Sequence, residues 1–198
     1  MQQPAERRSN RERTETTRRD LIAAARKLFT EKSYAETSTP EIVAAAGVTR
    51  GALYHHFEDK QALFRAVVEH EAELVAAEIE RAAPDTLPAR KALIAGGEAF
   101  IKAMATPGRT RLLLLDGPAV LGRAEMDAID ARHGTRTLRA GIAFAMRDGV
   151  MKRLSLDAVT ALVSSAFDRA ALAIDAGAPV EDYRKALTAL IEGLTPGR

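Results

Sequence analysis

Apolar residues recur along this chain at the spacing of amphipathic helices. The first clear stripe occupies positions i, i+1, i+4, i+7 and i+8 and consists of Leu21, Ile22, Ala25, Leu28 and Phe29. This spacing lines one face of a helix. Thr17, with Asp20 three residues later, resembles a capping box at its start. No segment alternates convincingly between apolar and polar residues as a strand does, so the pattern predicts an all-α protein.

Two shorter helices follow. Thr39 is suited to cap the second helix, with Pro40 at its first position. Gly47 supplies the left-handed residue that ends this helix. Thr49 can cap a third helix that runs to about His56.

Proline and glycine divide the rest of the chain into further helical segments. A fourth helix is predicted to begin near Asp59, and the last two helices at about 155–176 and 179–194. The boundary between a small N-terminal domain, residues 17–62, and a larger C-terminal domain, residues 63–198, falls inside the fourth helix. This helix would join the two domains mechanically.

The composition is that of a soluble globular protein, with 46% hydrophobic and 28% charged residues. The chain contains no cysteine, which excludes disulfide bonds and thiolate metal sites. Its polar N-terminal stretch lacks the apolar core of a secretory signal. No window approaches the roughly 20 apolar residues that span a bilayer. We therefore expect a cytoplasmic protein with no membrane partner.

The net charge of +2 is unevenly distributed. Residues 1–19 contain six Arg and three Glu, and the segment 1–16 is predicted to be a disordered basic arm. Such an arm suits attraction to a polyphosphate. A solvated tail without any partner explains the same charges.

Residues 38–57 are the strongest candidate for function. Two short helices joined by a tight turn with a glycine at the bend are typical of a helix-turn-helix motif, whose second helix enters the major groove of DNA. The spacing predicts an inner face of Ile42, Val43, Ala46, Val48, Leu53 and Phe57. The outer face then carries Thr49, Arg50, Gly51, Tyr54 and His55.

The residue types of the outer face fit contacts with nucleic acid. Gly51 costs up to about 1 kcal/mol in helix propensity, which makes sense if the backbone must approach a phosphate or base. Tyr54 and His55 can hydrogen-bond phosphates or pack on thymine methyl groups. Lys60 lies one turn beyond, where its ammonium could hold the sugar-phosphate chain. The alternative is a compact helical corner with its aromatic rings in the core.

The segment TSTPEIVAAAGVTRGALYHHFEDKQALF, residues 37–64, resembles the DNA-binding region of the tetracycline-repressor (TetR) family of bacterial transcription regulators. The resemblance extends over about residues 17–68. It implies an all-helical two-domain protein of about nine helices that binds a palindromic DNA operator as a homodimer. It also implies a repressor that a small-molecule effector releases. By motif position, the residues implied to contact phosphates or bases are Thr39, Thr49, Arg50, Gly51, Tyr54, His55 and Lys60.

Two positions depart from the usual pattern of this family. Ser33 stands where a glycine commonly precedes the aromatic Tyr34, and Val43 replaces the frequent alanine after Ile42. Both are packing or turn positions, so they concern local geometry rather than function.

The larger C-terminal part shows no signature of catalysis. Residues 84–198 contain no phosphate-binding glycine loop, no GxSxG elbow and no HExxH motif. We therefore predict that the protein is not an enzyme and has no cofactor. His70, within EHEAE, could ligate a metal, but a solvated helix face is the commoner explanation, and no metal site is predicted.

The last two predicted helices are rich in small residues, as in AVTALVSSAFDRAALAIDAGA. Small residues let helix axes approach closely, so two such helices could pair with their two-fold mates in a four-helix interface. Packing within one subunit explains the same composition. The family resemblance favours the interface, which places a homodimer contact at about residues 155–194.

The remaining segment, about residues 87–150, is expected to surround a cavity for an unknown small-molecule effector. Gly96 and Gly97 interrupt a helical pattern there, which close helix contact or space for a ligand would explain. The segment Thr106–Arg111 is a candidate hinge between this cavity and the DNA-binding region. Candidate lining residues are Phe100, Met104, Phe144, Met146 and Phe167, although packing in the core explains them as well.

Together these patterns predict a sequence-specific DNA-binding transcriptional regulator, a repressor released from its operator by a small molecule. A ligand-independent DNA-organising or division-control protein on the same scaffold is the alternative. An enzyme with a helical catalytic domain is a third class, which the absence of a catalytic constellation disfavours.

Overall fold

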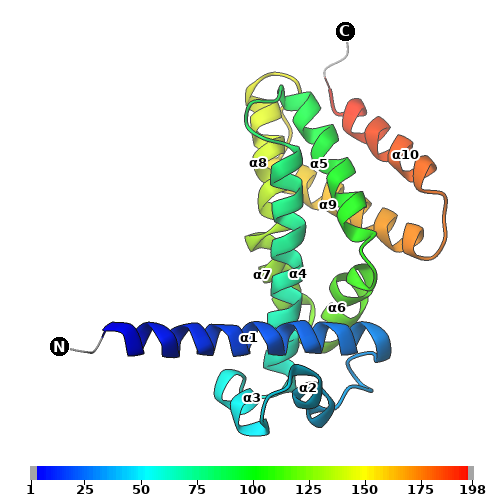
Figure 1. Cartoon of the computed structure of the whole chain (residues 1–198). Coiled ribbons are helices and arrows are strands. Elements are labelled where there is room, and N and C mark those ends of the chain that lie inside the picture. The colour runs from blue at the N-terminus through cyan, green and yellow to red at the C-terminus, as the bar shows by residue number, and fades with distance from the viewer. Residues whose placement is uncertain (1–3, 196–198) are drawn as a thin grey trace.

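The computed structural model describes residues 4–195, with side chains from residue 11 onward, and this part of the chain is all-helical (Figure 1). Ten α-helices and one π-helix, η1, follow one another without a strand in the described residues. Their bounds are α1 Pro4–Lys32, α2 Thr39–Ala46, α3 Arg50–His56, α4 Lys60–Ala82, α5 Ala89–Met104, η1 Arg111–Asp116, α6 Gly117–Leu121, α7 Arg123–Arg132, α8 Gly134–Arg147, α9 Leu156–Asp175 and α10 Val180–Gly193.

The helices form a small head and a larger body. Helices α1, α2 and α3 make the head at one end of the molecule, and α4 runs from the head along the body, as the sequence predicts (Figure 1). One buried apolar cluster joins α1–α4 to the lower body, where it includes Met104, Leu112 and Ile129. A second cluster lies among α5, α8, α9 and α10. The head is therefore fused to the body through a shared core.

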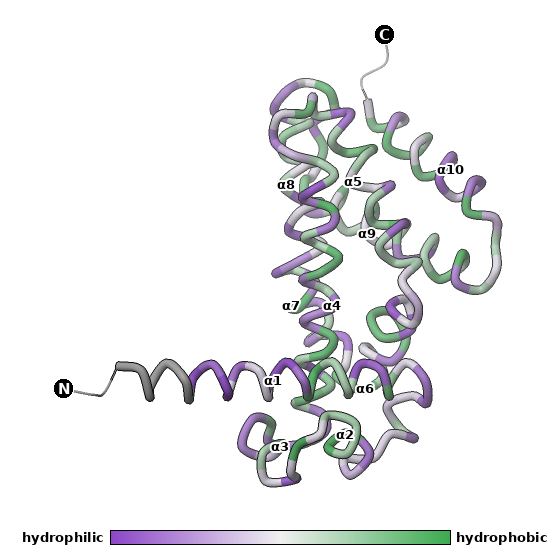
Figure 2. The backbone as a smooth tube through the Cα atoms, in the orientation of Figure 1, coloured by the Kyte–Doolittle hydropathy of each residue, from purple (hydrophilic) through white to green (hydrophobic). Residues whose placement is uncertain are grey.

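Helix α1 is longer than predicted. It begins at Pro4 rather than near Thr17, so the segment 4–16, predicted to be a disordered arm, is helical. This segment projects beyond the rest of the head (Figure 1), and the part of it that is coloured in Figure 2 is mostly hydrophilic. Alanine, arginine and glutamate are good helix formers, and no glycine or proline after Pro4 interrupts them. The helix already formed by the buried stripe from Leu21 onward can therefore extend backward into solvent, because adding a residue is easier than nucleation.

Local signals place most of the other helix ends. The N-cap of α2 is Ser38, one residue before the predicted Thr39, because Ser38 and Glu41 form a reciprocal capping box. Gly47 ends α2 at φ +65°. The side chains of Thr49 and Asp59 accept hydrogen bonds from the first turns of α3 and α4, as predicted for Thr49.

The last two helices match the predicted ranges to within one residue. Helix α9 starts after the predicted cap Ser155, which accepts a hydrogen bond from the amide of Ala158, and α10 starts after Pro179. The segment around DGP, residues 116–118, does not break the helical path as predicted. It continues from η1 directly into α6, with Pro118 in the first turn, where its missing N–H is not needed.

None of the helices in the described residues has the length and hydropathy of a membrane span.

Candidate nucleic-acid interface and effector cavity

The helix-turn-helix is held by a buried apolar core beneath it. Ile42 of α2 and Leu53 of α3 are fully buried, and Phe57 is 5% exposed. The rings of Phe29, Tyr34 and Phe64 pack on one another, with centroid distances between 4.9 and 5.7 Å. This packing orients α3 with its opposite face toward solvent at the end of the molecule (Figure 1).

The exposed face of α3 carries the residues that the sequence assigns to it. Thr49, Arg50, Gly51, Tyr54 and His55 are all exposed, with Tyr54 at 44%. The Arg50 guanidinium carbon lies 5.5 Å from the centre of the Tyr54 ring, so the cation and the phenol share one surface. The alternative of a corner with Tyr54 in the core does not hold, while Phe57 is in the core as expected.

Gly51 has no role in the internal packing of the head. A side-chain carbon built at this position would meet only Thr49 Oγ1, at 3.9 Å. Its backbone conformation is helical, which alanine also adopts. The glycine therefore costs helix stability without a steric reason inside the chain.

The two adjacent histidines have different surroundings. His55 is exposed, whereas His56 is half-buried, and their rings are 5.3 Å apart. Burial lowers the pKa of His56, and the charges of His55 and Arg18 lower it further, against an opposing effect of Glu15. His56 therefore belongs to the contact between α3 and α1, and only His55 remains available on the outer face.

Lys60, the first residue of α4, is half-buried against the loop before α2. Its ammonium donates hydrogen bonds to the carbonyl oxygens of Tyr34 and Thr37 at 2.9 and 3.0 Å, and it lies 4.2 Å from the centre of the Tyr34 ring. Two of its three donors are thus used to fasten the loop before α2 to the start of α4. Lys60 thus has a structural role, because the carbonyls at the end of that loop need donors. Its contact with the sugar-phosphate chain stays a prediction.

Thr39 lies in the first turn of α2 and is half-buried, so its hydroxyl is placed at the edge of the head rather than on α3. The cap function that the sequence assigns to it belongs to Ser38. Its contact with phosphate stays a prediction.

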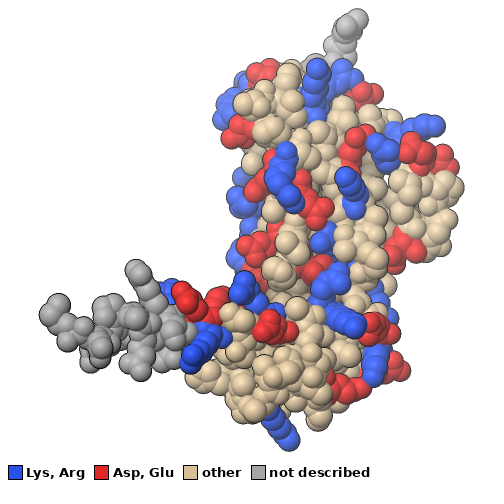
Figure 3. All heavy atoms as spheres, in the orientation of Figure 1, with Lys and Arg blue, Asp and Glu red and all other residues tan. Residues whose placement is uncertain are grey.

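Residues 1–16 are predicted to form a disordered basic arm, but residues 4–16 belong to helix α1, which also carries Arg18 and Arg19. Arg18 sits over the Phe57 ring at 5.4 Å from its centre, next to the end of α3. Arg11, Arg13 and Arg19 are exposed along the projecting half of α1. The base of the head is mostly uncharged in the view of Figure 3, with a basic side chain projecting from its tip. These arginines of α1 and Arg50 of α3 are therefore all exposed cations of the head.

A cavity of about 1000 Å³ lies in the body. It is bounded by α4, α5, α8 and α9, with contributions from α7 and the loop before α5. Three of the five predicted lining residues, Phe100, Phe144 and Phe167, line it. Phe100 and Phe167 contact each other edge to face at 5.5 Å.

Met104 and Met146 do not line the cavity. Met104 is 3% exposed within the cluster that joins the head to the body, and Met146 packs against the second apolar cluster. Met104 shares the face of Phe100 but lies one turn further along α5, where it packs into the cluster that joins head and body. Met146, two residues after Phe144, lies on a different face of α8. Which residues of a helix line a cavity depends on how the neighbouring helices pack against it, and the sequence pattern does not show this.

The two glycines of α5 serve close packing. A carbon added at Gly97 would approach Cζ of Phe167 to 2.6 Å, and one added at Gly96 would lie 3.4 Å from a methyl group of Ile79. Of the two explanations, close helix contact therefore accounts for Gly97, whose lack of a side chain admits the Phe167 ring to the cavity wall.

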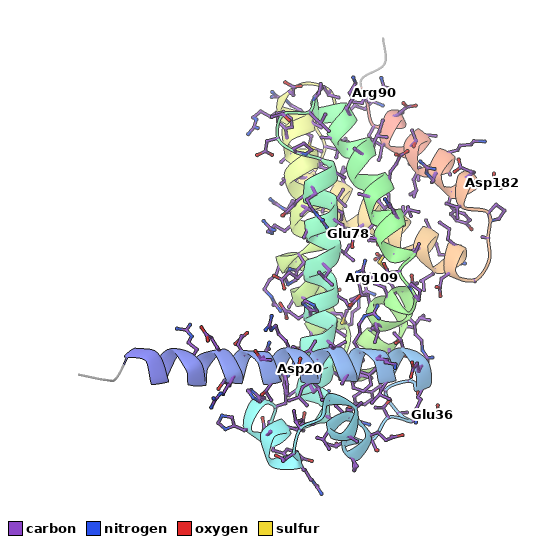
Figure 4. All side chains as sticks on the ribbon, viewed as in Figure 1. Asp20, Glu36, Glu78, Arg90, Arg109 and Asp182 are labelled. Atoms are coloured by element: carbon purple, nitrogen blue, oxygen red, sulfur yellow. The ribbon has the colours of Figure 1, made fainter. Side chains whose placement is uncertain are left out.

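The candidate hinge between cavity and head is tightly fastened. Arg109 is 4% exposed and donates to Glu71 at 2.8 Å, to Glu78 at 3.1 Å and to the carbonyl of Ala103 at 2.8 Å. Arg109 and Glu78 are labelled in Figure 4. Arg26 of α1 donates to the same Glu71 at 2.8 Å and to the carbonyl of Pro107 at 3.2 Å. The segment 106–111 is thus the place where the head contacts the body through buried charges.

No group of three His, Cys, Asp or Glu side chains in the described part of the chain is arranged to hold a metal ion. His70 is about half exposed, and its nearest acidic partner, Glu73, lies 3.8 Å away.

The chain matches two family models. Residues 21–67 match the model described as bacterial regulatory proteins, tetR family, and residues 90–195 match the tetracyclin repressor-like, C-terminal domain. These two ranges coincide with the head plus the start of α4, and with the body from α5 onward.

Curated relatives and solved structures agree with these matches. The HTH-type transcriptional regulator AcrR of Shigella flexneri is 42% identical over 62 residues, which are 31% of this chain and 29% of AcrR. The Transposon Tn10 TetC protein of Escherichia coli is 26% identical over 156 residues, 79% of each chain. The crystal structure of a TetR-family transcriptional regulator from Pectobacterium atrosepticum superposes with a TM-score of 0.75 at 31% identity, covering 94% of this chain and 98% of that one.

Proposed function

The chain belongs to the TetR family of bacterial regulatory proteins and is a helix-turn-helix transcriptional regulator, and on this premise we propose that it represses transcription from a palindromic operator. In this proposal it binds the operator as a homodimer, and a small molecule in the body cavity releases it. The family assignment does not identify the operator or the effector.

The observation that carries the DNA-binding role is the outer face of α3. Arg50, Gly51, Tyr54 and His55 are exposed together, and Gly51 is a helix-weakening residue with open space around it. A groove floor or a phosphate could approach the helix backbone closely there. Arg50 supplies a cation that can pair with phosphate or with a guanine edge.

The homodimer is supported by apolar side chains left on the surface of α9 and α10. Leu162 of α9 is 73% exposed and Leu190 of α10 is 57% exposed, and Val180 at the start of α10 is 41% exposed. Neighbouring exposed residues of α9 are small, which permits close approach of a second pair of helices. A two-fold axis through this face would present two α3 helices to successive major grooves, about 34–36 Å apart.

The release mechanism is supported by the cavity and by its connection to the head. Helix α4 contributes Ile79 and Glu80 to the cavity wall. The same helix contributes Glu78, directly before Ile79, and Glu71, about two turns earlier, to the ion pairs with Arg109. A ligand that prefers one arrangement of α4 would therefore change the position of the head, and only such differential binding can shift the equilibrium.

The test of the DNA-binding face uses operator affinity measured on folded variants. We expect Arg50→Ala to weaken operator binding by about 1–3 kcal/mol, and Tyr54→Ala to weaken it measurably as well. Arg153→Ala, an exposed cation of the body, is the matched control and should leave affinity unchanged. Wild-type affinity in both head variants would overturn the assignment of this face.

Gly51→Ala distinguishes an effect on helix stability from an effect on DNA binding. Because there is space for the methyl group, the variant should be equally or slightly more stable, by up to about 1 kcal/mol, while binding the operator more weakly. Thermal melting and a DNA titration of the same sample measure both effects. A variant that gains stability and keeps its affinity would show that no DNA approaches Gly51 closely.

A ligand-independent DNA organiser is not favoured, since such a protein has no use for a cavity of about 1000 Å³. Genome-wide occupancy distinguishes the two: a regulator should occupy few operators, and an organiser many sites.

A further inference from the structure

The body cavity combines aromatic walls with one carboxylate that has no partner. Asp168, on α9, lines the cavity one residue after Phe167, and Phe100 of α5 is part of the same lining. No hydrogen bond or ion pair to its carboxylate exists among the residues whose side chains the structure describes. The side chain is half-buried, so water outside the protein does not fully solvate it.

Most of the other charged groups of the lining contact a neighbouring side chain. Arg136 donates to Glu80 at 2.7 Å, and the Arg147 guanidinium lies over the Phe144 ring at 5.3 Å. Asp130 accepts hydrogen bonds from the amide and hydroxyl of Thr135. The remaining acidic residue of the lining, Asp85, is exposed at the loop before α5. Arg147 and Asp85 are exposed, whereas Asp168 is half-buried. Among the described residues, Asp168 is thus the half-buried carboxylate of the lining that has no hydrogen bond or ion pair.

The local environment of Asp168 makes its ionised carboxylate unfavourable for the stability of the folded chain. Burial and, to a smaller extent, the neighbouring charge of Asp130 raise the pKa of Asp168 to about 6, against a smaller opposing effect of Arg123. Arg123 itself pairs with Asp127 at 3.0 Å and is largely exposed. A carboxylate that neither pairs nor is fully hydrated destabilises the folded chain. Its presence is explained if the partner is a molecule that enters the cavity.

We propose that the effector is a lipophilic organic cation, an aromatic amine or ammonium compound, whose charge pairs with Asp168 and whose ring packs against Phe100 and Phe167. This assignment rests on the proposed role of the cavity as the effector site and names its ligand class. The cavity volume is in the range of sites for drug-sized ligands. Aromatic faces attract cations as well as apolar rings, so both walls and carboxylate select the same chemistry.

Three naphthalene probes of one shape test the charge preference on the purified full chain without DNA. They are 1-naphthylmethylamine, which is a cation at pH 7.5, neutral 1-naphthalenemethanol and anionic 1-naphthoate. Titration calorimetry or naphthalene fluorescence measures their affinities. We expect the cation to bind at least about tenfold more tightly than the alcohol, and the anion to bind most weakly.

Asp168→Asn should abolish the preference for the cation over the alcohol and leave the affinity for the alcohol within about threefold. Asp175→Asn, at the exposed end of the same helix, is the matched control and should retain the preference. The unchanged affinity for the alcohol shows that the Asn variant keeps a folded cavity.

Equal affinity of the wild type for cation and alcohol, tighter binding of the anion, or a preference that survives Asp168→Asn would each overturn the inference, as would failure of all three probes to bind. Because these titrations contain no DNA, any such result leaves the DNA-binding proposal to be judged by the Arg50 and Tyr54 variants. Conversely, loss of operator binding in those variants says nothing about the charge of the effector.

Discussion

Ser33 has a strained backbone conformation that hydrogen bonds to neighbouring residues accompany. It has φ +92°, the one positive φ of a non-glycine residue in the described backbone. Its carbonyl accepts a hydrogen bond from the Thr37 hydroxyl at 2.7 Å, and the amide of Glu36 donates to its side chain at 3.4 Å. The departure from the family glycine, visible in the sequence, thus coincides with a left-handed backbone position.

Ser33→Gly should therefore stabilise the protein. Glycine adopts a positive φ without steric cost, whereas an L side chain pays about 1–2 kcal/mol. The gain in the free energy of unfolding should be about 1 kcal/mol, because glycine also loses more entropy on folding. Chemical denaturation measures it. Ser165→Gly, at an exposed position of helix α9, is the comparison and should be destabilising. A loss of stability in Ser33→Gly would contradict this account.

Asp168 has a pH signature that is opposite to that of a paired carboxylate. Because its pKa is raised to about 6 in the folded state, the folded chain binds the extra proton, and stability falls as pH rises from about 4 to about 6. Asp168→Asn should therefore be more stable than the wild type at pH 7.5, by about 1–3 kcal/mol. The difference should vanish near pH 4, where both side chains are neutral. Equal unfolding free energies at pH 7.5 would contradict the predicted cost.

At the scale of elements, α1, α4 and the segment after α5 meet at Glu71, which is 1% exposed. Burial raises the pKa of Glu71, but hydrogen bonds from Arg26 and Arg109 outweigh it, so the pKa is lowered. Glu71 is thus ionised, and its stabilising contribution is present above the usual pKa of a glutamate and lost as pH falls through the lowered value. These ion pairs connect elements that the apolar pattern alone leaves independent.

Arg109→Met should be strongly destabilising, by about 3 kcal/mol, because it leaves the buried Glu71 and the half-buried Glu78 without their shared cation. Arg139→Met is the control: its partner Asp157 is 84% exposed, and the change should cost less than about 1 kcal/mol. Urea denaturation compares the two. Adding Glu71→Gln to Arg109→Met should recover part of the lost stability. Equal losses of stability in Arg109→Met and Arg139→Met would rule out a special role for this network.

At the scale of the whole molecule, a small head and a long body are joined through α4, with the exposed face of α3 at one end and the exposed leucines of α9 and α10 on the body (Figure 1). The cavity is lined by α4, which reaches the head, and by α9, which carries one of the exposed leucines. This arrangement permits one small displacement in the body to change the separation of two heads in a dimer.

The proposed dimer can be tested directly by measuring the molar mass of the protein in solution. Leu162→Glu combined with Leu190→Glu places two charges in the proposed interface, where their desolvation opposes association, and should give a monomer with much weaker operator binding. Leu115→Glu, equally exposed on η1 at 51%, is the control and should remain dimeric. Sedimentation or light scattering gives the mass. A dimeric double variant would place the interface elsewhere.

The sequence by itself determined the helical class, the helix-turn-helix and its exposed face. Caps such as Thr49, the left-handed Gly47 and the spacing of Ile42, Leu53 and Phe57 act between neighbours a few residues apart, so their meaning can be read along the chain. The ranges of α9 and α10 follow from the same kind of local signal.

Only the tertiary structure decided the inward turn of Lys60, the choice of Phe167 rather than Met104 for the cavity wall, and the pairing of Arg109 with Glu71. Each depends on which distant element supplies a carbonyl, a ring or a carboxylate within contact distance. That choice is made by the packing of the helices against one another, where a single turn or a rotation about a helix axis exchanges one partner for another.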